Sequence, residues 1–310
     1  MQSLRIGVNF YPFSRFPQPE QLLDMVEWCE KIGFYHVHMG EHYIVPKEND
    51  KLDNFWQDTS CMFAALSQRT KRIKFVYGVV VVPLHHPVQL ARAVATVDNL
   101  SKGRVIMGCG VGWTQREIEL MGTAFNERGA RTDDTLRAVR ALWSSETPTY
   151  EGRYITIKDM VFRPGTYQKP HPPIWIGGAA DATVRRAAEL GNGLQPIGGP
   201  LEKLARMAAE TRELLAKNGR EKDIADFAFT ITCDHGATVS HHSKQAGAKD
   251  FSMIVSPNAA EAVDQLGNWQ RAGYNHITVR FPDKELPALR DKVQRFRDEV
   301  VKPLGAVIDN

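Results

Sequence analysis

The chain has few cysteines, and they do not pair in a way that indicates a disulfide or a zinc site. Cys29, Cys61, Cys109 and Cys233 are far apart in the 310 residues, with no Cys-x-x-Cys pair. Isolated cysteines are typical of reduced core or site residues in a reducing compartment. The N-terminus enters strand-like sequence without a charged segment and an apolar signal core, so we expect a cytoplasmic protein.

Long apolar runs and a strong charge of either sign are also absent. The longest apolar stretch, near residues 79–84, is too short to span a bilayer, so we expect no membrane association. The net charge is only +3 and the basic residues are scattered, which argues against a nucleic-acid partner. Hydrophobic residues at 43% and charged residues at 24% are ordinary for a globular enzyme.

What the sequence does have is a glycine-rich turn. The segment 104–107 predicts a short buried strand, and Gly108, Gly110 and Gly112 follow at every second position before Trp113. Glycine is unfavourable inside a strand, so we expect something to approach this backbone closely. A strand, a glycine-rich turn and a helix can present backbone N–H groups to a phosphate. A tight turn beside a packed tryptophan is the alternative.

Strand-like and helical segments alternate along the whole chain. We expect eight strands, at residues 4–10, 34–39, 73–82, 104–107, 174–176, 193–197, 227–233 and 276–281. Strict alternation favours parallel strands with right-handed crossovers, and eight units fit a closed (β/α)8 TIM barrel. Residues 150–173 are rich in Pro, Gly, Thr and Tyr and predict an inserted hairpin before the fifth strand. We expect one domain over residues 1–310.

In such a barrel the active site forms where the strands end. The strand ends carry Asn9, Tyr11, Glu41, His42, Tyr77, Gly78, Val79, Cys109, Gly110, Val111, Gly112, Trp113, Gly177, Gly178, Ala179, Gln195, Asp234 and His235. This set contains no Ser-His-Asp order, no paired carboxylates and no metal triad, so we expect no metal site. Little acid–base chemistry beside several glycine-rich turns indicates that a cofactor carries the reaction.

Several of these motifs have a structural alternative. Glu41-His42 could be a structural pair on a loop, but its position at a strand end favours a functional role. His85-His86, before a proline and a helix, is interpreted as a turn and N-cap region. Gly177-Gly178 before a helix is a candidate phosphate cradle. Residues 128–133 are interpreted as a capping and salt-bridge segment that precedes a helix, and His241-His242 as a solvated pair in a polar loop over residues 234–251.

Taken together, these motifs resemble the bacterial-luciferase-like monooxygenase superfamily. The matching pieces are Glu41-His42, His86-Pro87, residues 97–104, Gly110-Val111-Gly112-Trp113 with Glu117, Phe125, Arg128-Gly129, Arg131, Asp133, Leu136, Leu142-Trp143, Tyr150-Glu151-Gly152 and residues 172–178. Residues 128–143 resemble the probable F420-dependent oxidoreductase subgroup. The resemblance covers nearly the whole chain and implies a TIM barrel with an insertion.

The resemblance also implies a cofactor and a place for it. A flavin or F420 ring would lie at the barrel mouth beside Glu41, His42 and Tyr77-Gly78-Val79, with a cis peptide between Gly78 and Val79. The cofactor would also contact Cys109, Gly110, Val111, Gly112, Trp113, Gly177, Gly178 and Ala179, with its phosphate end on residues 110–113 and 177–179.

The implied activity is hydride transfer between F420 and a small organic substrate, in a protein expected to form a homodimer. His42 would be the catalytic polar group, and Glu41 would orient it. Subgroup members often have Asp-His where this chain has Glu41-His42, and flavin-dependent relatives also carry Glu-His. An FMN monooxygenase supplied by a partner reductase is therefore the alternative, and a flavin-binding barrel without turnover is a third interpretation.

Overall fold

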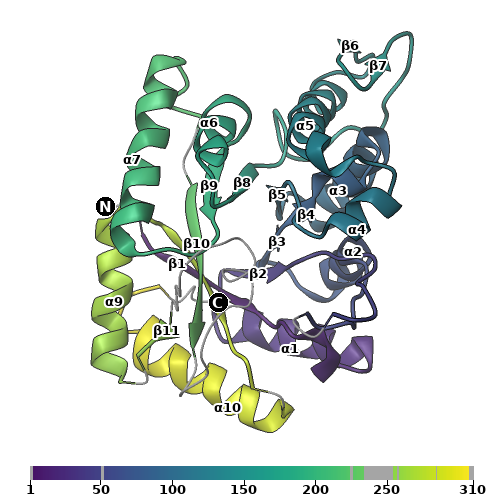
Figure 1. Cartoon of the computed structure of the whole chain (residues 1–310). Coiled ribbons are helices and arrows are strands. Elements are labelled where there is room, and N and C mark those ends of the chain that lie inside the picture. Colours follow the sequence, from purple (N-terminus) through teal and green to yellow (C-terminus); the bar gives the residue numbers. More distant parts are fainter. Residues whose placement is uncertain are drawn as a thin grey trace.

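The chain forms a closed barrel of eight parallel strands (Figure 1). The computed structural model describes residues 3–49, 52–223, 226–233, 254–256, 258–283 and 285–306. The barrel strands are β1 (Arg5–Asn9), β2 (His36–Met39), β3 (Lys74–Tyr77), β5 (Val105–Gly110), β8 (Ile174–Gly178), β9 (Gly193–Pro196), β10 (Asp226–Cys233) and β12 (His276–Arg280). Each pairs with the next, and β12 pairs back with β1. The predicted (β/α)8 architecture is confirmed.

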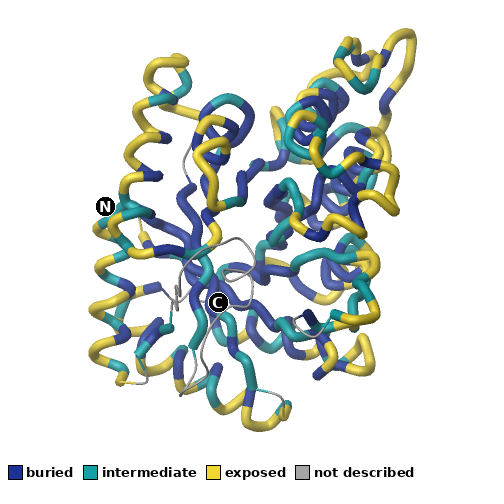
Figure 2. Tube along the Cα trace, viewed as in Figure 1, coloured by how far each residue is buried: buried dark blue, intermediate teal, exposed yellow. Residues whose placement is uncertain are grey.

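Helices cover the outside of the barrel. They are α1 (Pro19–Lys31), α2 (Thr59–Arg69), α3 (Pro87–Ser101), α5 (Arg128–Ser144), α6 (Asp181–Leu190), α7 (Leu201–Lys217), α9 (Ala259–Arg271) and α10 (Leu286–Phe296). Figure 2 shows the buried residues gathered in the strands and on the inner faces of the helices. Within the described part of the chain, no helix has the length and apolar character that crossing a membrane requires.

Strand residues alternate between the helix layer and the barrel interior. In β1, Ile6 and Val8 are buried in the apolar core, whereas Gly7 lies against the His36 ring and Asn9 bonds the His38 ring. This alternation follows from the two-residue period of a strand. It places one set of side chains beneath the helices and a second, mainly polar set inside the barrel.

The expected insertion is present as a hairpin. Strands β6 (Tyr150–Glu151) and β7 (Thr156–Ile157) pair antiparallel before the fifth barrel strand, β8. The Asp134 carboxylate on α5 accepts hydrogen bonds from the Tyr150 hydroxyl and from the backbone N–H groups of Arg153 and Tyr154. These bonds anchor the hairpin to α5.

Three expected boundaries were wrong. The third strand does not run continuously from residue 73 to 82: β3 ends at Tyr77, and the separate strand β4 (Val80–Val81) pairs with β5 and leads into a 3-10 turn, η2 (Val82–Leu84). Strand β5 continues to Gly110, since Gly108 and Cys109 pair within the sheet rather than forming a turn. Residues 128–133 lie inside α5, because the 3-10 turn η3 (Phe125–Glu127) runs into the helix without a break.

Candidate active site at the barrel mouth

A buried histidine–carboxylate pair lies at the C-terminal ends of the strands. His42 follows β2, and its Nδ1 lies 2.7 Å from Oε2 of Glu117 on the short helix α4 (Gln115–Leu120). The side chains are 7% and 1% exposed, respectively. The other Glu117 oxygen accepts the N–H groups of Tyr43 at 2.8 Å and Ile44 at 3.3 Å. A carboxylate only accepts, so Nδ1 carries the proton and Nε2 of neutral His42 is left as an acceptor.

Glu41 does not orient His42, contrary to the sequence-based expectation. Its Oε2 accepts hydrogen bonds from the Val81 N–H and from His85 Nε2, both at 2.9 Å. Consecutive residues leaving a strand point in opposite directions, so Glu41 and His42 contact different loops. Glu41 therefore fixes the β4–η2 segment, while Glu117 is the partner of His42.

Two tryptophan rings contact the histidine of this pair, and further apolar side chains are exposed at the strand ends. The His42 ring lies 4.8 Å from the Trp56 ring and 6.0 Å from the Trp113 ring, between centroids and edge to face. Tyr43, Trp113 and Ile197 follow β2, β5 and β9, and are 47%, 36% and 49% exposed. Exposed apolar side chains at the ends of several barrel strands suit a flat apolar ligand.

The floor beneath the mouth is a polar layer of three side chains from different strands. His38 Nδ1 lies 2.9 Å from Asn9 Nδ2, and His38 Nε2 lies 2.6 Å from the Gln195 carboxamide. The Asn9 orientation is determined, because its Oδ1 accepts the Tyr11 N–H and its Nδ2 donates to the His38 carbonyl. Asn9 therefore donates to Nδ1, and the His38 proton is on Nε2. The structure places the Gln195 amide nitrogen against Nε2 and leaves Gln195 Oε1 without a partner, so this tautomer requires the Gln195 amide to be turned with its oxygen toward Nε2. Burial lowers the pKa of His38 to about 4, which keeps the ring neutral.

The three alternating glycines face a neighbouring segment of the protein. A side chain at Gly108 would overlap the Tyr77 carbonyl. A Cβ at Gly110 would lie 2.6 Å from the Val79 side chain, and one at Gly112 2.6 Å from that of Val81. The expected close approach is thus confirmed, and the approaching groups are alternate residues of the segment 77–81.

The Gly78–Val79 peptide is cis, as the sequence resemblance implied. The His38 ring packs directly against Gly78, where any Cβ would overlap it. The Val79 side chain lies over two strands, since a Cβ at Gly110 or Gly177 would meet it at 2.6 Å or 2.9 Å. The peptide therefore lies on top of the polar floor.

A second backbone feature lies where β8 ends. Gly178 has φ of 149°, and the following helix α6 begins at Asp181 with no side-chain hydrogen bond from its N-cap, Ala180. The Lys203 ammonium donates to the Ala179 carbonyl at 3.2 Å. Uncapped N–H groups beside a lysine can bind an anion.

Two of the expected cofactor-binding residues can contribute only main-chain groups. The Tyr77 side chain points outward, packs 5.0 Å from Phe63 and lies 3.0 Å, hydroxyl to hydroxyl, from Ser60 on α2. Cys109 is also buried in the helix-facing core, where desolvation raises the pKa of its thiol. Gly110, Val111, Gly112, Trp113, Gly177, Gly178 and Ala179 lie at or directly after strand ends, as expected.

Arg280 is a site residue that the sequence reading missed. It ends β12, pairs in register with Asn9 and Thr232, and donates to the Thr232 hydroxyl at 3.0 Å. Desolvation lowers the pKa of its guanidinium. The strand period was the available signal, because Arg280 is four residues after the inward-facing His276.

The expected Asp234, His235 and His241-His242 lie outside the described residues. No group of three metal-ligating side chains occurs among the residues that are described.

Comparisons with known proteins agree with this architecture. Residues 12–307 match the model of a family described as luciferase-like monooxygenase. Limonene 1,2-monooxygenase of Rhodococcus erythropolis is 29% identical over 221 residues, which are 68% of this chain and 54% of that protein. The chain thus spans about half of that relative. An F420-dependent glucose-6-phosphate dehydrogenase of Microbacterium testaceum is 26% identical over 299 residues, 94% of this chain and 84% of that one.

A solved structure extends the comparison of the fold. The oxygenating constituent of 3,6-diketocamphane monooxygenase from Pseudomonas putida, in complex with FMN, superposes with a TM-score of 0.76. The superposition covers 97% of this chain and 98% of that one, at 16% identity. At this identity the likeness establishes the fold.

Proposed function

Because the chain belongs to the luciferase-like monooxygenase family, we propose that it is an F420-dependent oxidoreductase that transfers hydride to or from a small organic substrate. The observation that carries the proposal is the His42–Glu117 pair at the mouth. Oxidising an alcohol by hydride transfer also requires a group that takes the hydroxyl proton. A neutral histidine whose other nitrogen is held by a buried carboxylate suits that task.

The residues of the mouth fit a flavin-like cofactor. The ring would rest on the Gly78–Val79 peptide, between Val79 and the exposed rim of Tyr43 and Trp113. The phosphate would lie at the uncapped start of α6, beside Gly178 and Lys203. When bound, the deazaflavin supplies the hydride-accepting carbon, and the protein supplies binding, orientation and exclusion of water.

His42 and the polar floor have separate tasks in this proposal. Nε2 of His42 accepts the substrate proton, while Glu117 holds Nδ1–H and stabilises the charged ring that results. The neutral His38, bonded on both nitrogens, cannot exchange protons near neutral pH, so it supports Gly78 from below.

Cofactor binding tests the proposal most directly. The purified protein is titrated with oxidised F420 and with FMN, and bound cofactor is followed by fluorescence and equilibrium dialysis. We expect F420 to bind more tightly than FMN. Micromolar FMN binding with no F420 binding would reverse the assignment, and binding of neither would contradict a cofactor site at the mouth.

An FMN-dependent monooxygenase is the second candidate. Its support is the similarity to limonene 1,2-monooxygenase and the fold shared with the FMN-bound camphane enzyme. It would require reduced flavin from a partner reductase, and an oxygenated product formed from an organic substrate with FMNH2 and oxygen, above the spontaneous oxidation of FMNH2, would distinguish it. Binding of either cofactor without turnover would favour the non-catalytic barrel. The structure contains one chain, so the homodimer stays a prediction.

A further inference from the structure

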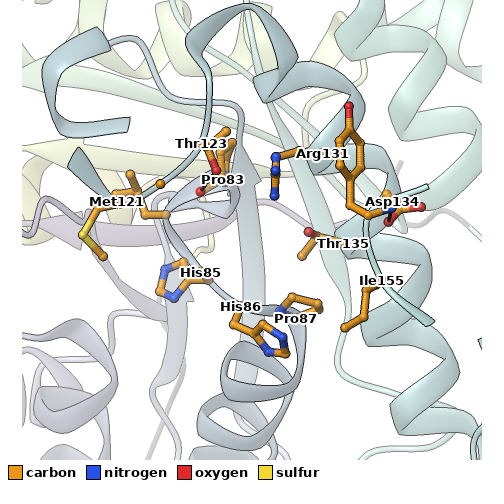
Figure 3. Close-up of a pocket in the computed structure, with 13 residues that line it drawn as sticks. Pro83, His85, His86, Pro87, Met121, Thr123, Arg131, Asp134, Thr135 and Ile155 are labelled. Atoms are coloured by element: carbon orange, nitrogen blue, oxygen red, sulfur yellow. Dashed lines mark hydrogen bonds between the residues drawn. The ribbon is translucent and has the colours of Figure 1, made fainter. Parts of the chain in front are cut away.

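A cavity of about 190 Å³ lies beside the mouth, between the start of α3, the start of α5 and the hairpin. Figure 3 shows Arg131 on one side of it and His86 with Pro87 on the other. His85 lines the cavity and also bonds Glu41 at 2.9 Å. The cavity is therefore next to the mouth but contains none of the residues assigned above to the cofactor.

Two buried polar atoms of the lining lack a hydrogen-bond partner and can donate, Nε of Arg131 and the Tyr154 hydroxyl. Nε of Arg131 has no hydrogen-bond partner, and the guanidinium lies 4.5 Å from the Tyr154 ring. Among the described residues its ion-pair contact is Glu127, at 3.7 Å, beyond hydrogen-bond reach. Nδ1 of His86 accepts the Val88 N–H at 3.3 Å, so neutral His86 carries its proton on Nε2 as a donor.

The acidic group in the lining is already satisfied. Both oxygens of Asp134 accept hydrogen bonds, at 2.7 to 3.1 Å, from the hairpin. The rest of the lining is mixed, with Thr123, Thr135 and Tyr154 as polar residues and Pro83, Leu84, Pro87, Met121 and Ile155 as apolar ones. The cavity thus combines a guanidinium whose Nε has no hydrogen-bond partner, a histidine donor and a group of apolar side chains.

We propose that this cavity is a second binding site, for a small organic carboxylate of about the size of benzoate. The carboxylate would pair with Arg131, and the apolar part would contact Leu84, Met121 and Ile155. Size supports this class, because an apolar protein cavity of about 150 Å³ holds benzene. Planar guanidinium is the group that best matches a carboxylate.

The test uses the protein without cofactor and benzoate as the probe, so its result does not depend on the proposed function. Binding is followed by ligand-observed NMR and by the benzoate-dependent rise in melting temperature. We expect saturable benzoate binding that Arg131→Gln weakens about 10- to 100-fold, since a charge-assisted hydrogen bond is lost. The control Arg137→Gln, on the exposed side of the same helix with Glu189 at 3.9 Å, should bind as the unaltered protein does.

Two further probes separate charge from shape. Benzamide has the same ring without the charge, and inorganic phosphate has charge without the ring. Both should bind at least tenfold more weakly than benzoate. The proposal is overturned if benzoate does not bind, if Arg131→Gln binds it normally, or if either control probe binds equally well.

Discussion

Replacing Glu117 by glutamine should disable His42 while leaving the fold intact. The carboxylate accepts from His42 Nδ1 at 2.7 Å and from the N–H groups of Tyr43 and Ile44. A carboxamide keeps one oxygen for those N–H groups but presents an NH2 group to Nδ1. His42 then has to move its proton to Nε2, so the nitrogen facing the substrate becomes a donor and can no longer take a proton.

The expected loss of activity follows from the tautomer. General acid–base groups typically contribute about 100-fold or more in rate, and the equivalent Asp→Asn change in the serine-protease triad lowers kcat about 10⁴-fold. We therefore expect Glu117→Gln to lower kcat at least about 100-fold, with KM for the cofactor changed little. Losing one charge-assisted hydrogen bond should cost about 1.5–3 kcal/mol of stability.

The assay is steady-state kinetics together with urea unfolding of the same samples. Glu119→Gln is the matched control, since Glu119 lies on the same helix but is exposed and contacts Gln115. Glu117→Ala should cost more stability than Glu117→Gln, because it also frees the loop at Tyr43. If Glu117→Gln folds and keeps turnover within about twofold, Glu117 does not set the state of His42.

Four further substitutions test other parts of the site. His42→Ala should lower turnover about 100-fold with a smaller loss of cofactor affinity. Glu41→Gln should lower turnover and cofactor affinity modestly. Steady-state kinetics measures turnover, and cofactor titration measures affinity. Gly108→Ala should destabilise by at least about 3 kcal/mol in urea unfolding, because its methyl group overlaps a backbone carbonyl, while Gly129→Ala on α5 should not. The unfolded chain binds the His38 proton more tightly than the folded one. The contribution of neutral His38 to the free energy of unfolding is therefore fully present above about pH 6.5 and is lost as the pH falls toward 4, by up to about 3 kcal/mol. His38→Gln should make the free energy of unfolding depend less on pH, as unfolding measured at pH 7 and at pH 5 will show.

The barrel could be predicted from the sequence because its strands and helices have different periods. The apolar residues Ile6 and Val8 at every second position of β1, and the helical spacing in α1 and α7, are local properties of the chain. The positions of the strand ends followed from the same pattern. That knowledge was enough to place His42 and Gly178 at the mouth.

The pairings inside the site could not be predicted in this way. His42 and Glu117 are 75 residues apart, and Glu41 and His85 are 44 apart. Each contact depends on how two loops meet after the barrel closes, which no local period encodes. Glu41 was the neighbour of His42 in sequence, and for that reason it was assigned the role that belongs to Glu117.

The glycines at the end of β5 and directly after it show a different limit. The sequence indicated close approach to Gly108, Gly110 and Gly112, and a phosphate was one group that could make it. The structure gives the role to the segment 77–81, because the two segments run side by side with equal two-residue periods. A packing requirement of the protein therefore explains these glycines without a ligand, and for this reason our proposal assigns the phosphate to the start of α6.

The mouth is held by two hydrogen-bond networks that share no side chain among the described residues. The floor consists of Asn9, His38 and Gln195, on β1, β2 and β9. The wall consists of the Glu41 and His42 pairs, which connect the loop after β2 to η2 and α4. Barrel interiors are usually filled by branched apolar side chains, which pack without fixing an orientation by hydrogen bonds. The polar floor here instead fixes the orientation of the His38 ring under Gly78, because hydrogen bonds engage both ring nitrogens.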